Sequence, residues 1–250
     1  MKILPPKPNE FFGARIKINR ANEHILDLKN IFEYYLKNDS YTLDVKKDKS
    51  GLNAIVLETN PLLPPNFPTH IGDTFHNLRT ALDHVTSDIV GKKDKRSGFP
   101  IDASEEKFRK SPKLTVLSAA SPAVYEYILH TLKPFGKRHP LVELSQCDNA
   151  DKHRLLLPTF SITEVTNIQA VCSNQGQYKD ITLSASNGNF VSGIATDANI
   201  TITSEGVPTG ELRFSSDHEF AGMPVLPTLN QLSQIVTNVV LEIQKIHFRT

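Results

Sequence analysis

The stretch FFGARIKINRANEHILDLKNIFEYY, residues 11–35, predicts the first element of the fold. Its apolar residues follow one another at alternating intervals of three and four, as they do along one side of an α-helix. They are Phe11, Ala14, Ile18, Ala21, Ile25, Leu28, Phe32 and Tyr35. Arg15, Lys17 and Glu23 fall on the other sides. The spacing therefore predicts one long amphipathic helix with a single buried side.

The C-terminal segment repeats this pattern. Its apolar residues are Leu229, Leu232, Val236, Val239, Ile243 and Ile246. Long helices bury an apolar side by packing against another helix. We therefore expect the two helices, at opposite ends of the chain, to pack on each other or on shared neighbours.

Two other regions alternate apolar and polar residues, as half-buried strands do. Residues 41–59 alternate in this way around Lys49-Ser50-Gly51, which predicts a hairpin. Residues 155–225 alternate several times, and Asn187-Gly188 and Glu205-Gly206 supply turns between the runs. This region is expected to form an antiparallel β insertion.

The expected fold class is therefore α+β. Residues 1–154 would form a helical bundle that includes the hairpin at 41–59. An antiparallel β region would follow over 155–225, and the last helix, 226–250, would pack back on the bundle.

Residues 69–90 predict a second helix, with Thr69 as its N-cap after a proline-rich loop and Gly91 just past its end. Its apolar side consists of Ile71, Phe75, Leu78, Leu82, Val85 and Ile89. Its polar side consists of Asp73, His76, Asn77, Thr80, Asp83, His84, Ser87 and Asp88. No Lys or Glu occurs from 69 to 91, although these residues dominate most solvated helix faces.

Short polar side chains weaken a helix interior because they compete for its backbone hydrogen bonds. Three interpretations of the polar side stay open: buried hydrogen bonds that tie the bundle together, an active or binding face, and a solvated face. A second polar cluster, Asp148-Asn149-Ala150-Asp151-Lys152-His153-Arg154, follows a helix that opens at Pro140. We expect this cluster and the polar side of helix 69–90 to meet across a shared, partly dry space.

Composition narrows the class of protein. The chain has 250 residues, a net charge of +1 and two cysteines, Cys147 and Cys172, so a disulfide framework and a CxxC zinc site are not expected. No apolar run reaches the length of a membrane helix, and the first residues lack the apolar core of a signal peptide. We expect a cytoplasmic protein without a membrane partner. Residues 92–154 hold 13 basic and 8 acidic side chains, an excess that suits a polyanion.

Three motifs in the first two thirds of the chain occur in a recognisable order. They are His76-Asn77-Leu78-Arg79 with Ala81-Leu82-Asp83-His84, then Phe99-Pro100-Ile101, then Asn149 with Asp151-Lys152-His153-Arg154. In this order they resemble a widespread bacterial protein family with an NLRxALDH helix, an FPI element and an NxDKHR segment. The family has no established activity. The chain departs from its pattern at Asp148-Asn149-Ala150, where a Ser-Asn pair becomes Cys-Asp-Asn.

The segment from Arg79 to His84 is also similar to the Arg-x4-6-His motif of the HEPN superfamily, many of whose helical bundles are metal-independent ribonucleases. This resemblance implies RNA as a partner, a homodimer as an assembly and no cofactor. Arg79 would hold the scissile phosphate, and His84 and His153 would transfer protons. The substrate-binding side chains would be His76, Asn77, Asp83, Asp151, Lys152 and Arg154. If the protein is an enzyme, this resemblance makes it a ribonuclease.

Two alternatives stay open beside the ribonuclease. The first is a metal site that uses His76, Asp73, Asp83 or His84 together with His153. His76 and His84 lie about 12 Å apart along an ideal helix, so only one of them could join such a site. The second alternative is a non-catalytic module in which the polar cluster braces the bundle, for example through Asp83 and Arg154.

Overall fold

The fold is α+β, as predicted, with long helices near both ends of the chain and strands before the last helix. The computed structural model describes residues 10–60, 62–91, 96–173, 175–186, 189–191, 194–216 and 219–248. The chain divides into two compact units. The helical unit comprises 1–28, 68–157 and 214–250, and the strand unit comprises 29–67 and 158–213.

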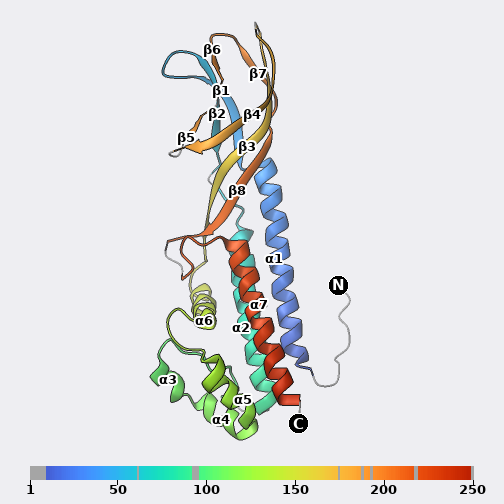
Figure 1. Cartoon of the computed structure of the whole chain (residues 1–250), viewed down its shortest axis with the longest axis vertical. Helices are drawn as coiled ribbons and strands as arrows, with labels where there is room; N and C mark the ends of the chain where they lie inside the picture. Colours follow the sequence, from blue (N-terminus) through green and yellow to red (C-terminus); the bar gives the residue numbers. More distant parts are fainter. Residues whose placement is uncertain are drawn as a thin grey trace. The chain divides into compact units, whose positions relative to one another are not determined.

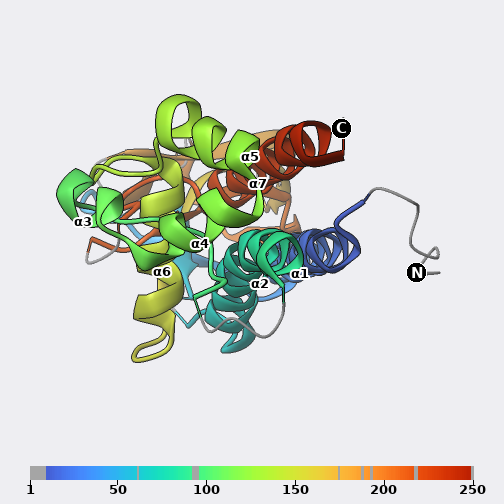
Figure 2. The ribbon, with the colours of Figure 1, turned by 90° about the horizontal axis from the view of Figure 1, so that it is seen from below.

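Three long helices form the body of the helical unit: α1 (Phe12–Asn38) as far as Leu28, α2 (Asn66–Val90) from Pro68 onward, and α7 (Val225–Phe248). They run side by side in Figures 1 and 2. Every apolar residue predicted to lie on the buried side of α1 is at most 8% exposed. The predicted apolar side of α7 is buried from Leu229 to Ile243. Each such side chain contributes about 1.5–3 kcal/mol of transfer free energy, so this packing holds the bundle together.

The shorter helices of the helical unit follow α2 along the chain. They are α3 (Glu105–Arg109), α4 (Pro112–Ala120), α5 (Pro122–Glu126), the π-helix η1 (Tyr127–Leu132) and α6 (Pro140–Asp151). The predicted start at Pro140 is confirmed. Since α6 ends at Asp151, most of the predicted polar cluster is the last turn of a helix.

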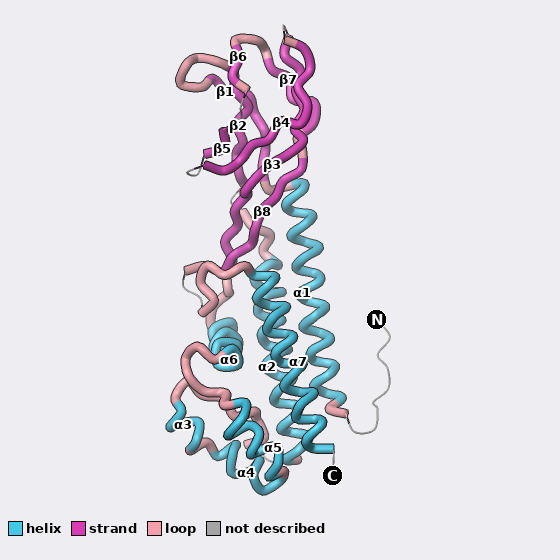
Figure 3. The backbone as a smooth tube through the Cα atoms, in the orientation of Figure 1, coloured by secondary structure: helices cyan, strands magenta, loops and turns pink. Residues whose placement is uncertain are grey.

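All of the described strands, magenta in Figure 3, fall in the strand unit apart from the last residue of β8. They are β1 (Tyr41–Lys47), β2 (Asn53–Thr59), β3 (Pro158–Cys172), β4 (Gly176–Ser186), β5 (Asn189–Val191), β6 (Ala195–Thr196), β7 (Ile200–Ser204) and β8 (Val207–Phe214). One sheet has the order β1-β2-β6, and the other has the order β5-β4-β3-β7 with β8 also paired to β3. Their shared core includes Ile55, Val165 and Leu183.

The structure differs from the sequence prediction at two boundaries. The hairpin β1–β2 was expected in the bundle but belongs to the strand unit, because β2 pairs with β6 at Asn53 and Thr196. Helix α2 begins at Asn66 rather than after Thr69, because Pro68 fits the first turn of a helix, where its missing N–H is not needed. The predicted turn at Asn187-Gly188 lies outside the described residues. Among the helices that are described, none is long and apolar enough to span a membrane.

Candidate functional site

The polar side of α2 is shared among three neighbours in the helical unit. Its N-terminal half faces the last turns of α6, its middle faces the loop at Phe99, and one edge faces α1. Few of its polar groups are left to solvent alone, which fits a helix side rich in short polar residues. Each neighbour makes a different set of contacts with the helix.

Helix α6 contributes a carboxylate that contacts both a histidine and a lysine. The Nδ1 atom of His76 lies 3.0 Å from Asp148 Oδ1, and Lys152 Nζ donates to Asp148 Oδ2 at 2.8 Å. The carboxylate side chain is 8% exposed, whereas those of His76 and Lys152 are 53% and 50% exposed. A buried carboxylate therefore holds a half-exposed imidazole and a half-exposed ammonium, one on each oxygen. We call His76, Asp148, Asp151 and Lys152 the His76 site.

The carboxyl group of Asp151 lies directly against the backbone of α2 at Gly72. A Cβ added to Gly72 would clash with both carboxylate oxygens, so only glycine permits this approach. Burial raises the pKa of Asp151, and repulsion from Asp73 and Asp148 raises it further, while His76 opposes the shift. The Asp151 carboxyl therefore keeps its proton to a higher pH than an ordinary aspartate.

This shift gives the fold a measurable pH dependence. Because the folded-state pKa of Asp151 is raised, its contribution to stability is present below the ordinary Asp value of about 3.9 and is lost as pH rises through the folded value. Asp151→Asn, which stays neutral, is expected to be more stable than the wild type at pH 7. The advantage should vanish near pH 3–4. Urea unfolding of the two proteins between acidic and neutral pH measures their free energies of unfolding. If these two free energies change with pH in parallel, the raised pKa of Asp151 is contradicted.

The loop at Phe99 is fastened to the middle of α2 by ionic and backbone contacts. Arg79 Nη1 donates to Asp83 Oδ1 at 2.7 Å, and Arg79 Nη2 donates to the Phe99 carbonyl at 3.2 Å. The Phe99 N–H donates to the same Asp83 oxygen at 2.7 Å. Lys113 from α4 approaches the Phe99 carbonyl at 3.4 Å, and burial, followed by the charge of Arg79, lowers its pKa. We call Arg79, Asp83 and Phe99 the Arg79 brace.

The edge of α2 that faces α1 makes a third set of contacts. Lys17 Nζ donates to Asn77 Oδ1 at 3.3 Å, and Asn77 in turn donates to the Asp73 carbonyl at 2.8 Å. Further along, the ring of His84 lies over Gly13, where an added Cβ would stand 2.7 Å from the ring Nδ1. His84 is therefore packed against α1.

These contacts place the sequence-predicted residues in separate groups. His76, Asp151 and Lys152 meet around Asp148, a carboxylate that the sequence argument left in the cluster without a role. Arg79 and His84, predicted to act together, have different partners: the guanidinium holds Asp83 and the Phe99 loop, and the imidazole lies on Gly13. Five residues span about 140° of a helix, which explains why they point to different neighbours.

The last two predicted residues, His153 and Arg154, are exposed beyond the end of α6. Asp83, which was expected to pair with Arg154, forms an ion pair with Arg79 at 2.7 Å. Among the described residues, no group of three or more His, Cys, Asp or Glu side chains is placed to hold a metal ion. The predicted metal set of His76, Asp73, Asp83 or His84 with His153 therefore does not assemble there.

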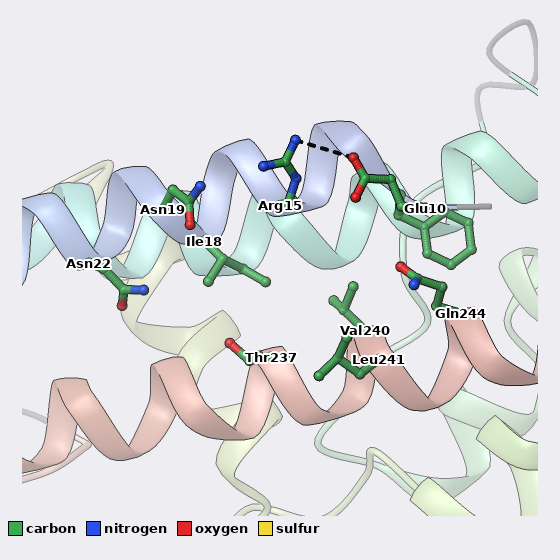
Figure 4. Close-up of a pocket in the computed structure, with 10 residues that line it drawn as sticks. Glu10, Arg15, Ile18, Asn19, Asn22, Thr237, Val240, Leu241 and Gln244 are labelled. Carbon is green, nitrogen blue, oxygen red and sulfur yellow. Dashed lines mark ion pairs between the residues drawn. The ribbon is translucent and has the colours of Figure 1, made fainter. Parts of the chain in front are cut away.

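A groove between α1 and α7 is a separate feature of the helical unit. It encloses about 320 Å³, and Figure 4 shows Ile18 from α1 facing Val240 and Leu241 from α7 across it. The ion pair of Arg15 with Glu10, 3.2 Å, lies at one end. Its other lining residues are apolar or neutral, so the groove offers one carboxylate, which is paired with Arg15, and no histidine. The His76 site is therefore the stronger candidate for chemistry.

No protein-family profile, curated protein or solved structure matches this chain. A function is therefore inferred from the geometry of the chain's own residues.

Proposed function

We propose that the protein is an RNA-binding, metal-independent ribonuclease of the HEPN-like type, in which His76 rather than His84 is the general base. The observation that carries this proposal is Asp148, which holds His76 Nδ1 at 3.0 Å and Lys152 Nζ at 2.8 Å on its two oxygens. A buried carboxylate that orients a half-exposed imidazole is a common arrangement for proton transfer.

The pairing with Asp148 selects the tautomer of His76. When Nδ1 donates its hydrogen to Asp148, the lone pair of Nε2 is available to accept a proton. Thr80 Oγ1 lies 3.5 Å from this Nε2, on the same helix. His76 Nε2 would take the proton of an RNA 2′-hydroxyl, whose oxygen then attacks the neighbouring phosphorus.

The other residues of the site supply the remaining steps of cleavage. The Lys152 ammonium would donate to a non-bridging phosphate oxygen as negative charge develops there. Asp151, whose pKa is raised by burial and by neighbouring carboxylates, would be the group that gives a proton to the departing 5′-oxygen. The basic excess of residues 92–154 favours attraction of a polyanion toward this unit.

The test is an assay of RNA cleavage with the full chain in the presence of a metal chelator. His76→Gln is expected to lower the cleavage rate about 100-fold, because glutamine keeps a donor toward Asp148 but transfers no proton. A substrate lacking the 2′-hydroxyl at the cleaved position should not react, since the attacking oxygen is gone.

His84→Gln and His153→Gln are the matched controls for this experiment. Both remove an imidazole from the same region, and both should leave the cleavage rate within a few fold of wild type. A wild type that cleaves no RNA, or a loss of activity in His84→Gln with His76→Gln unaffected, would remove the proposal.

The second candidate is a non-catalytic module in which the polar side of α2 braces the bundle. The Arg79 brace favours it, because a guanidinium 9% exposed and engaged with Asp83 and the Phe99 carbonyl has a structural use that needs no substrate. The absence of RNA cleavage in the wild type would leave this candidate in place.

A further inference from the structure

A pair of histidines lies on the α1–α2 interface, apart from the His76 site. His24 of α1 and His70 of α2 place their Nδ1 atoms 3.3 Å apart, with ring planes inclined at 57°. His24 is 6% exposed, whereas His70 is partly open to solvent. A small ion could therefore reach the two nitrogens from the His70 side.

A neighbouring carboxylate favours one tautomer of His24. Asp73 Oδ2 lies 3.9 Å from His24 Nε2, on the side of the ring away from His70. A hydrogen on Nε2 faces this carboxylate, which leaves the lone pair of Nδ1 directed toward His70. Carboxylates act in this way on the outer nitrogen of histidines that bind metals, where they fix the tautomer and strengthen the ligand.

We propose that His24 and His70 bind one divalent transition-metal ion, of which Zn²⁺ is the probe of choice, through their two Nδ1 atoms. Two nitrogens at about 2.0–2.1 Å from a tetrahedral zinc lie about 3.3–3.4 Å from each other, which matches the observed separation. Imidazole ligands favour zinc, nickel and copper over magnesium and calcium. Water completes the coordination, since the described residues offer no third ligand.

This site differs from the metal site expected from the sequence, which drew its ligands from Asp73, His76, Asp83, His84 and His153; here the ligands are His24 and His70. It is also independent of the proposed ribonuclease, whose chemistry uses no metal. The two proposals therefore succeed or fail separately. Zinc would join α1 to α2 at His24 and His70, and we expect it to stabilise the helical unit.

The experiment is calorimetric titration of the full, chelator-treated chain with Zn²⁺ at pH 7.5. Wild type should bind one equivalent, and His70→Gln should weaken binding at least about tenfold, because one of two protein ligands is lost. Asp73→Asn is expected to weaken it about 10-fold through the loss of its contact with His24. His130→Gln, which removes an exposed histidine paired with Glu126, is the matched control and should bind zinc like the wild type.

Thermal unfolding tests zinc binding in variants whose folding is disturbed by the substitution. Zinc should raise the Tm of wild type by mass action, and it should leave the Tm of His24→Gln and His70→Gln unchanged. Wild type that binds no zinc, or His70→Gln that binds as tightly as wild type, would overturn the proposal.

Discussion

Arg79→Met is expected to lower the free energy of unfolding by about 2–3 kcal/mol, because it removes the buried cation of the Arg79 brace. Arg79 is 9% exposed, and its guanidinium donates to both Asp83 and the Phe99 carbonyl. Without it, the Phe99 carbonyl keeps only Lys113 Nζ, at 3.4 Å, as a side-chain donor, and Asp83, 41% exposed, loses its ion-pair partner. Urea unfolding monitored by circular dichroism measures the loss.

Arg109→Met provides a matched control on α3. Arg109 also pairs with a carboxylate four residues away, Glu105, at 2.7 Å, but both side chains are about half exposed, at 47% and 52%. Exposed pairs of this kind contribute about 0.2–1 kcal/mol, so the control variant should unfold almost like the wild type. Equal losses in the two variants would show that burial gives Arg79 no special structural role.

Arg79→Met also distinguishes a structural role of Arg79 from a phosphate-binding role. If the arginine of the Arg-x4-His motif holds a phosphate, Arg79→Met abolishes RNA cleavage even well below its Tm. In the structure the partners of Arg79 are Asp83 and Phe99. The folded Arg79→Met variant should therefore keep most of the wild-type RNA cleavage. An inactive but fully folded Arg79→Met would favour the motif.

The long helices could be predicted because the residues that pack in their core recur at helical intervals in the sequence. The residues of α1 that recur every three or four positions are the ones buried in the structure. The polar side of α2 was likewise visible as an unusual set of short side chains, and its enclosure followed from their poor fit to a solvated helix.

The partners of that polar side could not be predicted in the same way. The Phe99 loop binds Asp83 and Arg79 through its backbone N–H and carbonyl. Because these groups do not depend on the type of residue, the sequence does not indicate which of them will bind a side chain. His24 was overlooked because it occurs within a helix whose visible signal is apolar. The role of Gly72 depends on how closely α6 approaches α2, which the sequence does not indicate.

Gly72→Ala is expected to destabilise the protein by about 1–2 kcal/mol, although alanine normally stabilises a helix interior by about 1 kcal/mol over glycine. The reason is Asp151, whose carboxylate occupies the space of the new methyl group. In an Asp151→Ala background this space is free, so Gly72→Ala should become stabilising.

A double-mutant cycle tests this reversal of sign. The coupling between Gly72→Ala and Asp151→Ala should reach about 2–3 kcal/mol, near the upper end for residues in contact. Asp88→Ala, at an exposed position of the same helix, should change stability equally in both backgrounds. If Gly72→Ala has the same effect with and without Asp151, the two helices do not approach as described. The His76 site, which depends on that approach to bring Asp151 beside His76 and Asp148, would then lose its proton donor.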